Sequence, residues 1–159
     1  TRLLHGQVAT GWTHSTHPDR IIVVSDTVCH DKLRTNMIKQ AAPSGVQVHV
    51  IPIKNMVKAN NDPRFGDTRA MLLFESVEDA LGAVKAGVDV KEINLGSSAY
   101  KEGKVNVTKA LSFDQTDVDA IKELQSLGVK FDVRGVPSDS PANVDALIKS
   151  AETKLAEKK

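Results

Sequence analysis

Short apolar runs alternate with longer amphipathic segments along this chain. Residues 21–24, Ile-Ile-Val-Val, form a continuous apolar run, which is typical of a strand buried on both faces. The same pattern predicts further strands at residues 46–53, 69–74, 90–95 and 129–133, with one or two short extended pieces between residues 105 and 113.

Helical periodicity fills most of the intervals between these runs. The first helix carries Val28, Leu33, Met37, Ile38 and Ala41 and ends before the Pro-Ser-Gly sequence at residues 43–45. Further helices are predicted at residues 54–60, from residue 76 to about 87, at 114–127 and at 142–156.

Strands that alternate with helices of this length predict an α/β fold. We expect a doubly wound, mostly parallel open sheet with helices on both faces, in one domain spanning residues 1–159. In such sheets ligands bind at the carboxyl ends of the strands. Residues that directly follow a predicted strand are therefore candidates for a functional site.

Composition is that of an ordinary globular protein and excludes several classes. The formal net charge is +1, with 40% hydrophobic and 26% charged residues, so neither a nucleic acid nor a membrane surface is indicated as a partner. Cys29 is the single cysteine, which favours an intracellular protein. No apolar run approaches the roughly 18 residues of a membrane span.

The first eight residues contain the strongest candidate for chemistry. Arg2, His5, Gly6 and Gln7 lie together where a short apolar stretch gives way to a helix-like run. Histidine is nucleophilic near neutral pH, and glycine lets the backbone approach an anion. The N–H groups of a following helix and an arginine could hold phosphate oxygens. The alternative is that His5 only caps a helix or lies in a turn.

The run Arg-Leu-Leu-His-Gly-Gln-Val resembles the active-site segment of the IIB component of the bacterial sugar phosphotransferase system, mannose/fructose/sorbose family. The family motif reads approximately Asp-x-Arg-Leu-[Ile/Leu]-His-Gly-Gln-Val. The sequences Ile-Ile-Val-Val-Ser-Asp, Arg-Ala-Met-Leu-Leu-Phe and Glu-Ile-Asn-Leu-Gly at residues 21–26, 69–74 and 92–96 also resemble its later strand ends. The motif's aspartate and first strand would precede Thr1.

This resemblance implies a phosphoryl relay. His5 would take a phosphoryl group from a phospho-IIA protein or domain and pass it to a sugar carried by the IIC and IID membrane components. Arg2 would stabilise the phosphate, and the backbone of Gly6 and Gln7 would bind it. The resemblance implies no cofactor and no metal, and a cytoplasmic protein that associates peripherally with the transporter.

Asp26 and Ser76 each follow a predicted strand and would lie at the same edge of the sheet as His5. Each has a second interpretation as a helix cap, which we favour for both. Ser76 is followed at the third position by Asp79, which resembles a weakened capping box.

Other polar residues carry weaker signals. His14 and His17 have a metal-ligand spacing, but they lie in a polar connection, so we expect solvated side chains. His49 alternates with valines on a strand and needs no chemical role, and Trp12 is expected in the core. The isolated cations Arg64, Arg69 and Lys101 are expected on a solvated face rather than in a landing zone for an anionic partner.

Two competing classes remain open from the sequence. A non-catalytic α/β binding or regulatory module could keep His5 as a cap and never become phosphorylated. A small-molecule enzyme with a nucleotide at the strand ends is less well supported, because no Gly-x-Gly-x-x-Gly or P-loop sequence follows a strand.

Overall fold

The structure, a computed structural model, describes residues 11–98 and 100–158. The chain divides into two compact units, with the boundary between Asp89 and Val90. The organisation of residues 1–159 as a single domain stays a prediction.

The first unit is built on a parallel sheet with strand order β2-β1-β3. Strand β1 (Arg20–Val24) lies between β2 (Gln47–Ile51) and β3 (Ala70–Leu73), and Ile22 stands opposite both His49 and Leu72. The helices of this unit are α1 (Thr13–Thr16), α2 (Lys32–Gln40), α3 (Ile53–Asn60) and α4 (Val77–Lys85), with 3₁₀ turns η2 (Val28–His30) and η3 (Pro63–Phe65).

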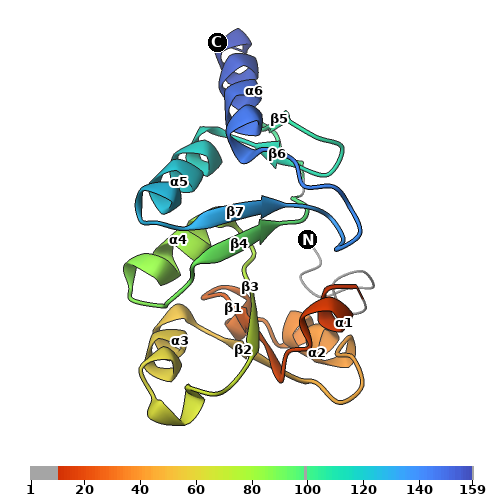
Figure 1. The fold of residues 1–159 in the computed structure, drawn as a ribbon, viewed down its shortest axis with the longest axis vertical. Coiled ribbons are helices and arrows are strands. Elements are labelled where there is room, and N and C mark those ends of the chain that lie inside the picture. The colour runs from red at the N-terminus through yellow and green to blue at the C-terminus, as the bar shows by residue number, and fades with distance from the viewer. Residues whose placement is uncertain (1–10, 99, 159) are drawn as a thin grey trace. The chain divides into compact units, whose positions relative to one another are not determined.

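Helices cover both faces of this sheet, as Figure 1 shows, with α2 on one side and α3 and α4 on the other. Ile21 and Val23 point toward α2 and pack in one cluster with Val28 and Ile38. Because side chains alternate along a strand, Ile22 points to the opposite face, and it is 3% exposed. Burial on both faces explains why residues 21–24 are continuously apolar.

The second unit contains two pairs of strands. Strands β4 (Glu92–Leu95) and β7 (Lys130–Val133) are parallel, whereas β5 (Val105–Asn106) and β6 (Ser112–Phe113) are antiparallel. Helices α5 (Gln115–Ser126) and α6 (Val144–Glu157) pack on each other, α5 also contacts β6 and β7, and α6 contacts β5 and β7. Phe113, Ile121 and Leu124 are the largest fully buried side chains of this unit.

The predicted α/β class and its parallel pairing are confirmed, and most strands lie within a few residues of their predicted positions. The prediction of one helix from Val28 onward is wrong. Val28 belongs to a 3₁₀ turn, and Asp31 then begins a separate helix as its N-cap. On that helix only Ile38 is buried, while Leu33 and Met37 are exposed.

Candidate functional site

The predicted phosphoryl-transfer residues Arg2, His5, Gly6 and Gln7 lie outside the described residues. The described part of the candidate site is the carboxyl edge of the β2-β1-β3 sheet, where Asp26 and Ser76 were expected. Both residues follow their strands as predicted, and the contacts of their side chains can be compared with the two interpretations of each.

Asp26 follows β1, and its carboxylate is a cap, but not of the helix that comes next. Its Oδ1 accepts a hydrogen bond of 2.8 Å from the backbone N–H of Ile53, the first residue of α3. The N-cap of α3 is Pro52, which has no side-chain oxygen to offer, so the carboxylate supplies what the local sequence lacks. Asp26 therefore caps a helix, as predicted, but the prediction that this is the next helix in the chain is wrong. The next helix, α2, is capped by Asp31.

Ser76 is the N-cap of α4. Its Oγ accepts a hydrogen bond of 3.1 Å from the backbone N–H of Asp79, and its backbone is extended, as an N-cap requires. The preferred prediction of a helix cap is confirmed. The proposal that Ser76 also faces the reacting groups gains no support from these contacts.

At this edge, side-chain oxygens of the chain itself accept hydrogen bonds from backbone N–H groups at the helix starts. Asp31 accepts from the Arg34 N–H at the start of α2, and Ser25 accepts from the Val28 N–H at the start of η2. Together with the caps from Asp26 and Ser76, each described helix start that follows a strand of this sheet already has a side-chain acceptor. One N–H group at each of these helix starts is therefore already bonded within the chain.

Acidic groups at the same edge shape its electrostatics. Burial raises the pKa of Asp79, and the negative charges of Glu75 and Asp26 raise it further, whereas its hydrogen bond to Ser76 acts in the opposite direction. Glu75 forms an ion pair of 2.9 Å with the Arg34 guanidinium of α2. The arginine offsets part of the negative charge at the edge.

In the second unit, the carboxyl ends of β4 and β7 carry an arginine that the sequence analysis did not single out. Arg134 donates from Nε to Asp132 Oδ1 at 3.0 Å and from Nη1 to the Pro137 carbonyl at 3.1 Å. Asn94 donates to the Arg134 carbonyl at 3.0 Å. A guanidinium held in this way is a suitable anion ligand. Its position directly after a predicted strand was the available signal.

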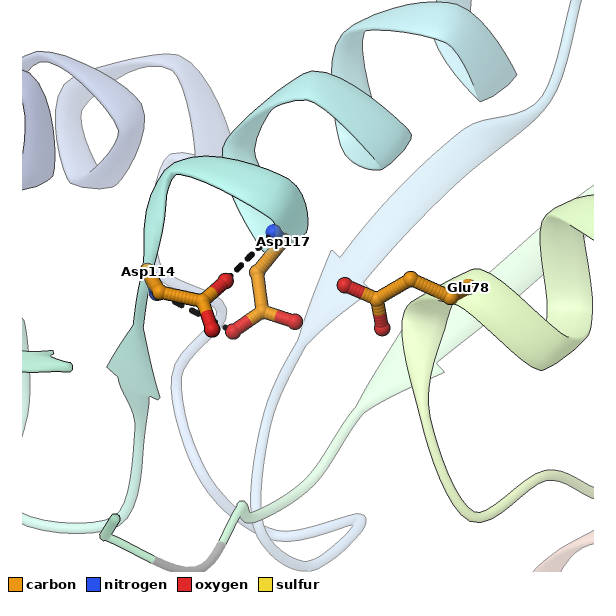
Figure 2. Close-up of side chains that lie close together, drawn as sticks. All are labelled: Glu78, Asp114 and Asp117. Atoms are coloured by element: carbon orange, nitrogen blue, oxygen red, sulfur yellow. Dashed lines mark hydrogen bonds between the residues drawn. The ribbon is translucent and has the colours of Figure 1, made fainter. Parts of the chain in front are cut away.

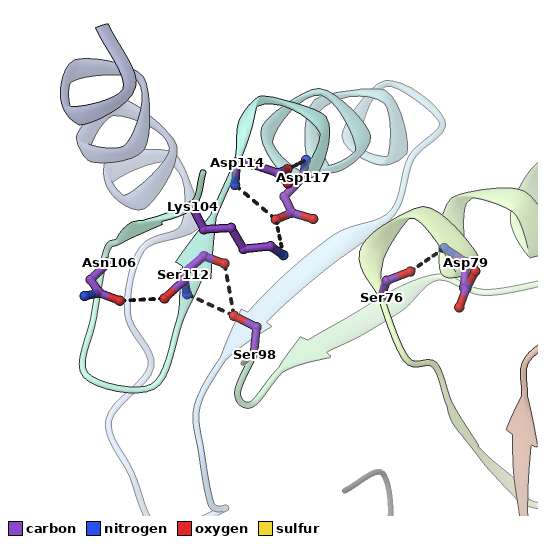
Figure 3. A network of polar contacts seen from close by, with 8 residues as sticks. All are labelled: Ser76, Asp79, Ser98, Lys104, Asn106, Ser112, Asp114 and Asp117. Atoms are coloured by element: carbon purple, nitrogen blue, oxygen red, sulfur yellow. Dashed lines mark hydrogen bonds and ion pairs between the residues drawn. The ribbon is translucent and has the colours of Figure 1, made fainter. Parts of the chain in front are cut away.

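A polar network ties the β5–β6 hairpin to the segment before it, as Figure 3 shows. Ser98 Oγ accepts from the Ser112 N–H at 2.9 Å and donates to the Ser112 carbonyl at 3.1 Å, while Ser112 Oγ donates to Asn106 at 2.6 Å. Ser112 is buried, so these bonds satisfy polar groups that water cannot reach. These hydrogen bonds stabilise the hairpin, and they give no reason to assign the network a role in catalysis.

Helix α5 starts at a reciprocal capping box between Asp114 and Asp117, drawn in Figure 2. Asp117 Oδ2 accepts from the Asp114 N–H at 3.1 Å and from Lys104 Nζ at 2.8 Å. Asp117 is 5% exposed. This buried carboxylate therefore joins the helix start to the loop that carries Lys104.

The described histidines do not form a metal-binding or catalytic cluster with other side chains. His14, His17 and His30 are exposed, as expected for solvated side chains. Within residues 11–98 and 100–158, no histidine or cysteine joins two further side chains at metal-ligand distances. His49 is partly buried, and its Nε2 has no hydrogen-bond partner. Burial and the positive charges of Arg20 and Lys39 lower the pKa of His49.

Two of the isolated cations, Arg64 and Arg69, are held by contacts within the chain. The guanidinium of Arg64 pairs with Asp62 at 2.7 Å and lowers the pKa of that carboxyl to about 2. Arg69 donates to the Thr16 carbonyl, and Lys101 is exposed. Trp12 is half-buried. Among the described helices, none is both long enough and apolar enough to cross a bilayer.

The described structure belongs to the class of parallel α/β proteins whose functional groups gather at strand ends. Comparison with known proteins identifies the family within this class. All of residues 1–159 match the family described as the sorbose-subfamily IIB component of the phosphotransferase system. The chain belongs to this family.

Individual relatives agree with this assignment. The mannose-specific EIIAB component of Escherichia coli strain K12 is 41% identical over 147 residues, which cover 92% of this chain and 46% of that protein. The chain thus spans about half the length of this relative. The sorbose-specific EIIB component of Lacticaseibacillus casei is 37% identical, over 92% of this chain and 90% of that protein.

A solved structure confirms the fold. The IIBSor domain of the sorbose permease from Klebsiella pneumoniae superimposes with a TM-score of 0.89 at 38% identity, covering 94% of this chain and 91% of that one. The α/β architecture with a parallel sheet and flanking helices is therefore that of a sorbose-type IIB protein.

Proposed function

We propose that His5 accepts a phosphoryl group from a phospho-IIA protein or domain and transfers it to a sugar that enters through the IIC and IID membrane components. The observation that carries this proposal is the run Arg-Leu-Leu-His-Gly-Gln-Val at residues 2–8 in a chain that belongs to the sorbose-type IIB family. The protein would work in the cytoplasm, at the surface of the transporter.

The relay has two balanced steps. In the first, an unprotonated imidazole nitrogen of His5 attacks phosphorus while the P–N bond to the IIA histidine breaks; the family resemblance implies Nδ1 as the attacking atom. In the second, a sugar hydroxyl attacks the same phosphorus, the P–N bond to His5 breaks, and the hydroxyl proton is released. Both steps depend on in-line geometry and charge stabilisation more than on acid–base chemistry.

Arg2 and the backbone N–H groups of Gly6 and Gln7 would stabilise the charge on the phosphoryl oxygens. The described edge of the first unit supports this assignment indirectly. Asp26, Asp31 and Ser76 each already accept one N–H group at its helix starts, which leaves fewer donors for an anion there. Phosphate binding is then expected to rely on the Arg2–Gln7 segment.

A labelling experiment tests the proposal. The full chain is incubated with radiolabelled phosphoenolpyruvate, the general phosphocarriers and the cognate IIA protein. We expect base-stable, acid-labile label on the wild type and no label on His5→Ala. His14→Ala is the matched control, because His14 is an exposed histidine outside the proposed segment, and it should be labelled normally.

Further variants separate the roles of the residues. Arg2→Ala should fold normally and accept phosphate slowly, and Arg134→Gln in the same assay reports whether the second unit's guanidinium takes part. Label that persists on His5→Ala would refute the assignment. A wild type that binds IIA but never becomes labelled would instead identify the non-catalytic binding module.

A further inference from the structure

Helix α2 exposes two large apolar side chains that the fold does not use. Leu33 is 71% exposed and Met37 is 58% exposed, although most large apolar residues described in this unit are at least partly buried. Four residues apart on a helix, they lie on the same face. Asn36 and Gln40 share this face and are also exposed. We call these four residues the α2 face.

Helix α2 itself carries only basic charged residues, although Arg34 is paired with Glu75. Helix α2 contains Lys32, Arg34 and Lys39 and no acidic residue. Lys32 and Lys39 are exposed on one flank of the face, and Arg34 lies on the other. An apolar centre with two exposed lysines on one flank matches a partner that presents apolar and anionic groups together.

Contacts fix the start of α2 at the carboxyl edge of the sheet. Arg34 Nη2 lies 2.9 Å from Glu75 Oε2, and Glu75 follows β3 at its carboxyl end. Asp31 caps the helix immediately before Lys32. The first turn of α2, with Leu33 on it, therefore stands at the edge where parallel sheets bind their ligands.

We propose that the α2 face is the docking surface for the phospho-IIA partner. This inference rests on the proposed function, because a IIA protein must bring an anionic phosphoryl group to the carboxyl edge that α2 borders. The exposed Lys32 and Lys39 complement that charge. Methionine also suits a surface that must adapt to a partner.

A protein fits this face better than a lipid bilayer does. Helix α2 has only nine residues, and its exposed apolar surface consists of Leu33 and Met37. Helices that bind membrane surfaces carry a broader apolar face, often with aromatic residues. Two exposed apolar side chains surrounded by polar and basic groups are instead typical of the centre of a small protein interface.

Binding and transfer are measured separately to test the proposal. The full chain is titrated with the cognate IIA protein whose phosphorylated histidine is replaced by alanine, so that binding occurs without transfer. We expect the double variant Leu33→Ser, Met37→Ser to bind about tenfold more weakly or worse. Leu127→Ser is the matched control, because Leu127 is 52% exposed on another element, and it should bind as the wild type does.

Transfer from phospho-IIA gives a second readout. The double variant should require a higher IIA concentration for half-maximal rate, while the rate at saturating IIA and the label on His5 stay unchanged. Unchanged IIA affinity in the double variant would overturn the docking proposal. So would a double variant that loses only self-association or binding to anionic vesicles, which would assign the face to a second copy or to a membrane.

The two proposals fail in different ways. If His5→Ala retains its label, the proposed phosphoryl site is wrong, whereas the affinity for unphosphorylatable IIA still decides the docking proposal. If the wild type shows no affinity for IIA by direct titration, the docking proposal fails, even where label reaches His5 at high IIA concentration.

Discussion

The buried ion pair between Lys104 and Asp117 yields a quantitative prediction about stability. The side chain of Asp117 is 6% exposed and that of Lys104 is 18% exposed, with 2.8 Å between Nζ and Oδ2. The same Oδ2 also accepts the Asp114 N–H at the start of α5. Asp117→Asn keeps the shape and one acceptor oxygen, but removes the charge that Lys104 faces (Figure 3).

The expected loss follows from the geometry. A hydrogen bond to a charged group contributes about 1.5–3 kcal/mol. Removing one partner of a fully buried pair costs about 3–5 kcal/mol, because the other charge stays desolvated. Lys104 retains some exposure and can move its ammonium toward water, so the cost is closer to the lower range. We expect Asp117→Asn to lower the free energy of unfolding by about 2 kcal/mol.

Urea denaturation of the full chain, followed by circular dichroism, measures this loss. Glu152→Gln is the control, because its ion pair with Lys122 is 2.8 Å long but its side chain is 45% exposed, and it should cost less than about 1 kcal/mol. The double variant Lys104→Met, Asp117→Asn should lose less free energy of unfolding than the two single variants lose in sum. Additive losses, or a loss no larger than that of the control, would refute the reasoning.

Three further predictions concern the caps and the partly buried His49. Asp26→Ala should lower the free energy of unfolding by about 1 kcal/mol, because Ile53 loses its acceptor, and His5 labelling should persist; abolished labelling in a stable variant would place Asp26 in the site. Ser76→Ala should cost about 1 kcal/mol, and Ser76→Asp should recover most of it, as urea titration can check. Folding lowers the pKa of His49 from 6.5, so the unfolded chain binds this proton more tightly and stability falls as pH drops through 6.5. His49→Gln should flatten the stability profile from about pH 7 to pH 5, as urea titration at each pH can check.

Regular elements were predictable wherever burial controls the sequence. The run at residues 21–24 is apolar on both faces because helices cover both sides of β1, and the pattern of a central strand follows directly. The helix after it was misread because Leu33 and Met37 look like core residues in the sequence. Hydrophobic periodicity reports apolar side chains, whether they face the core or a solvent-exposed surface.

The candidate site was predictable only where the contacts are local. Ser76 caps the helix that begins at the next residue, so three residues of sequence contain the signal. Asp26 bonds to a residue 27 positions away, and this pairing exists only because β1 and β2 are adjacent in the sheet. For Arg134 the sequence offered only its position after a strand, since its contact with the Pro137 carbonyl depends on a turn that the sequence does not specify.

The hydrogen bond from the Ile53 N–H to Asp26 provides a spectroscopic probe of the carboxyl edge. An amide that donates to a carboxylate has a chemical shift that follows the charge and position of that carboxylate. A phosphoryl group or a partner protein arriving nearby would change both. The Ile53 resonance in a ¹⁵N-labelled sample can therefore follow successive states of the relay without any substitution in the chain.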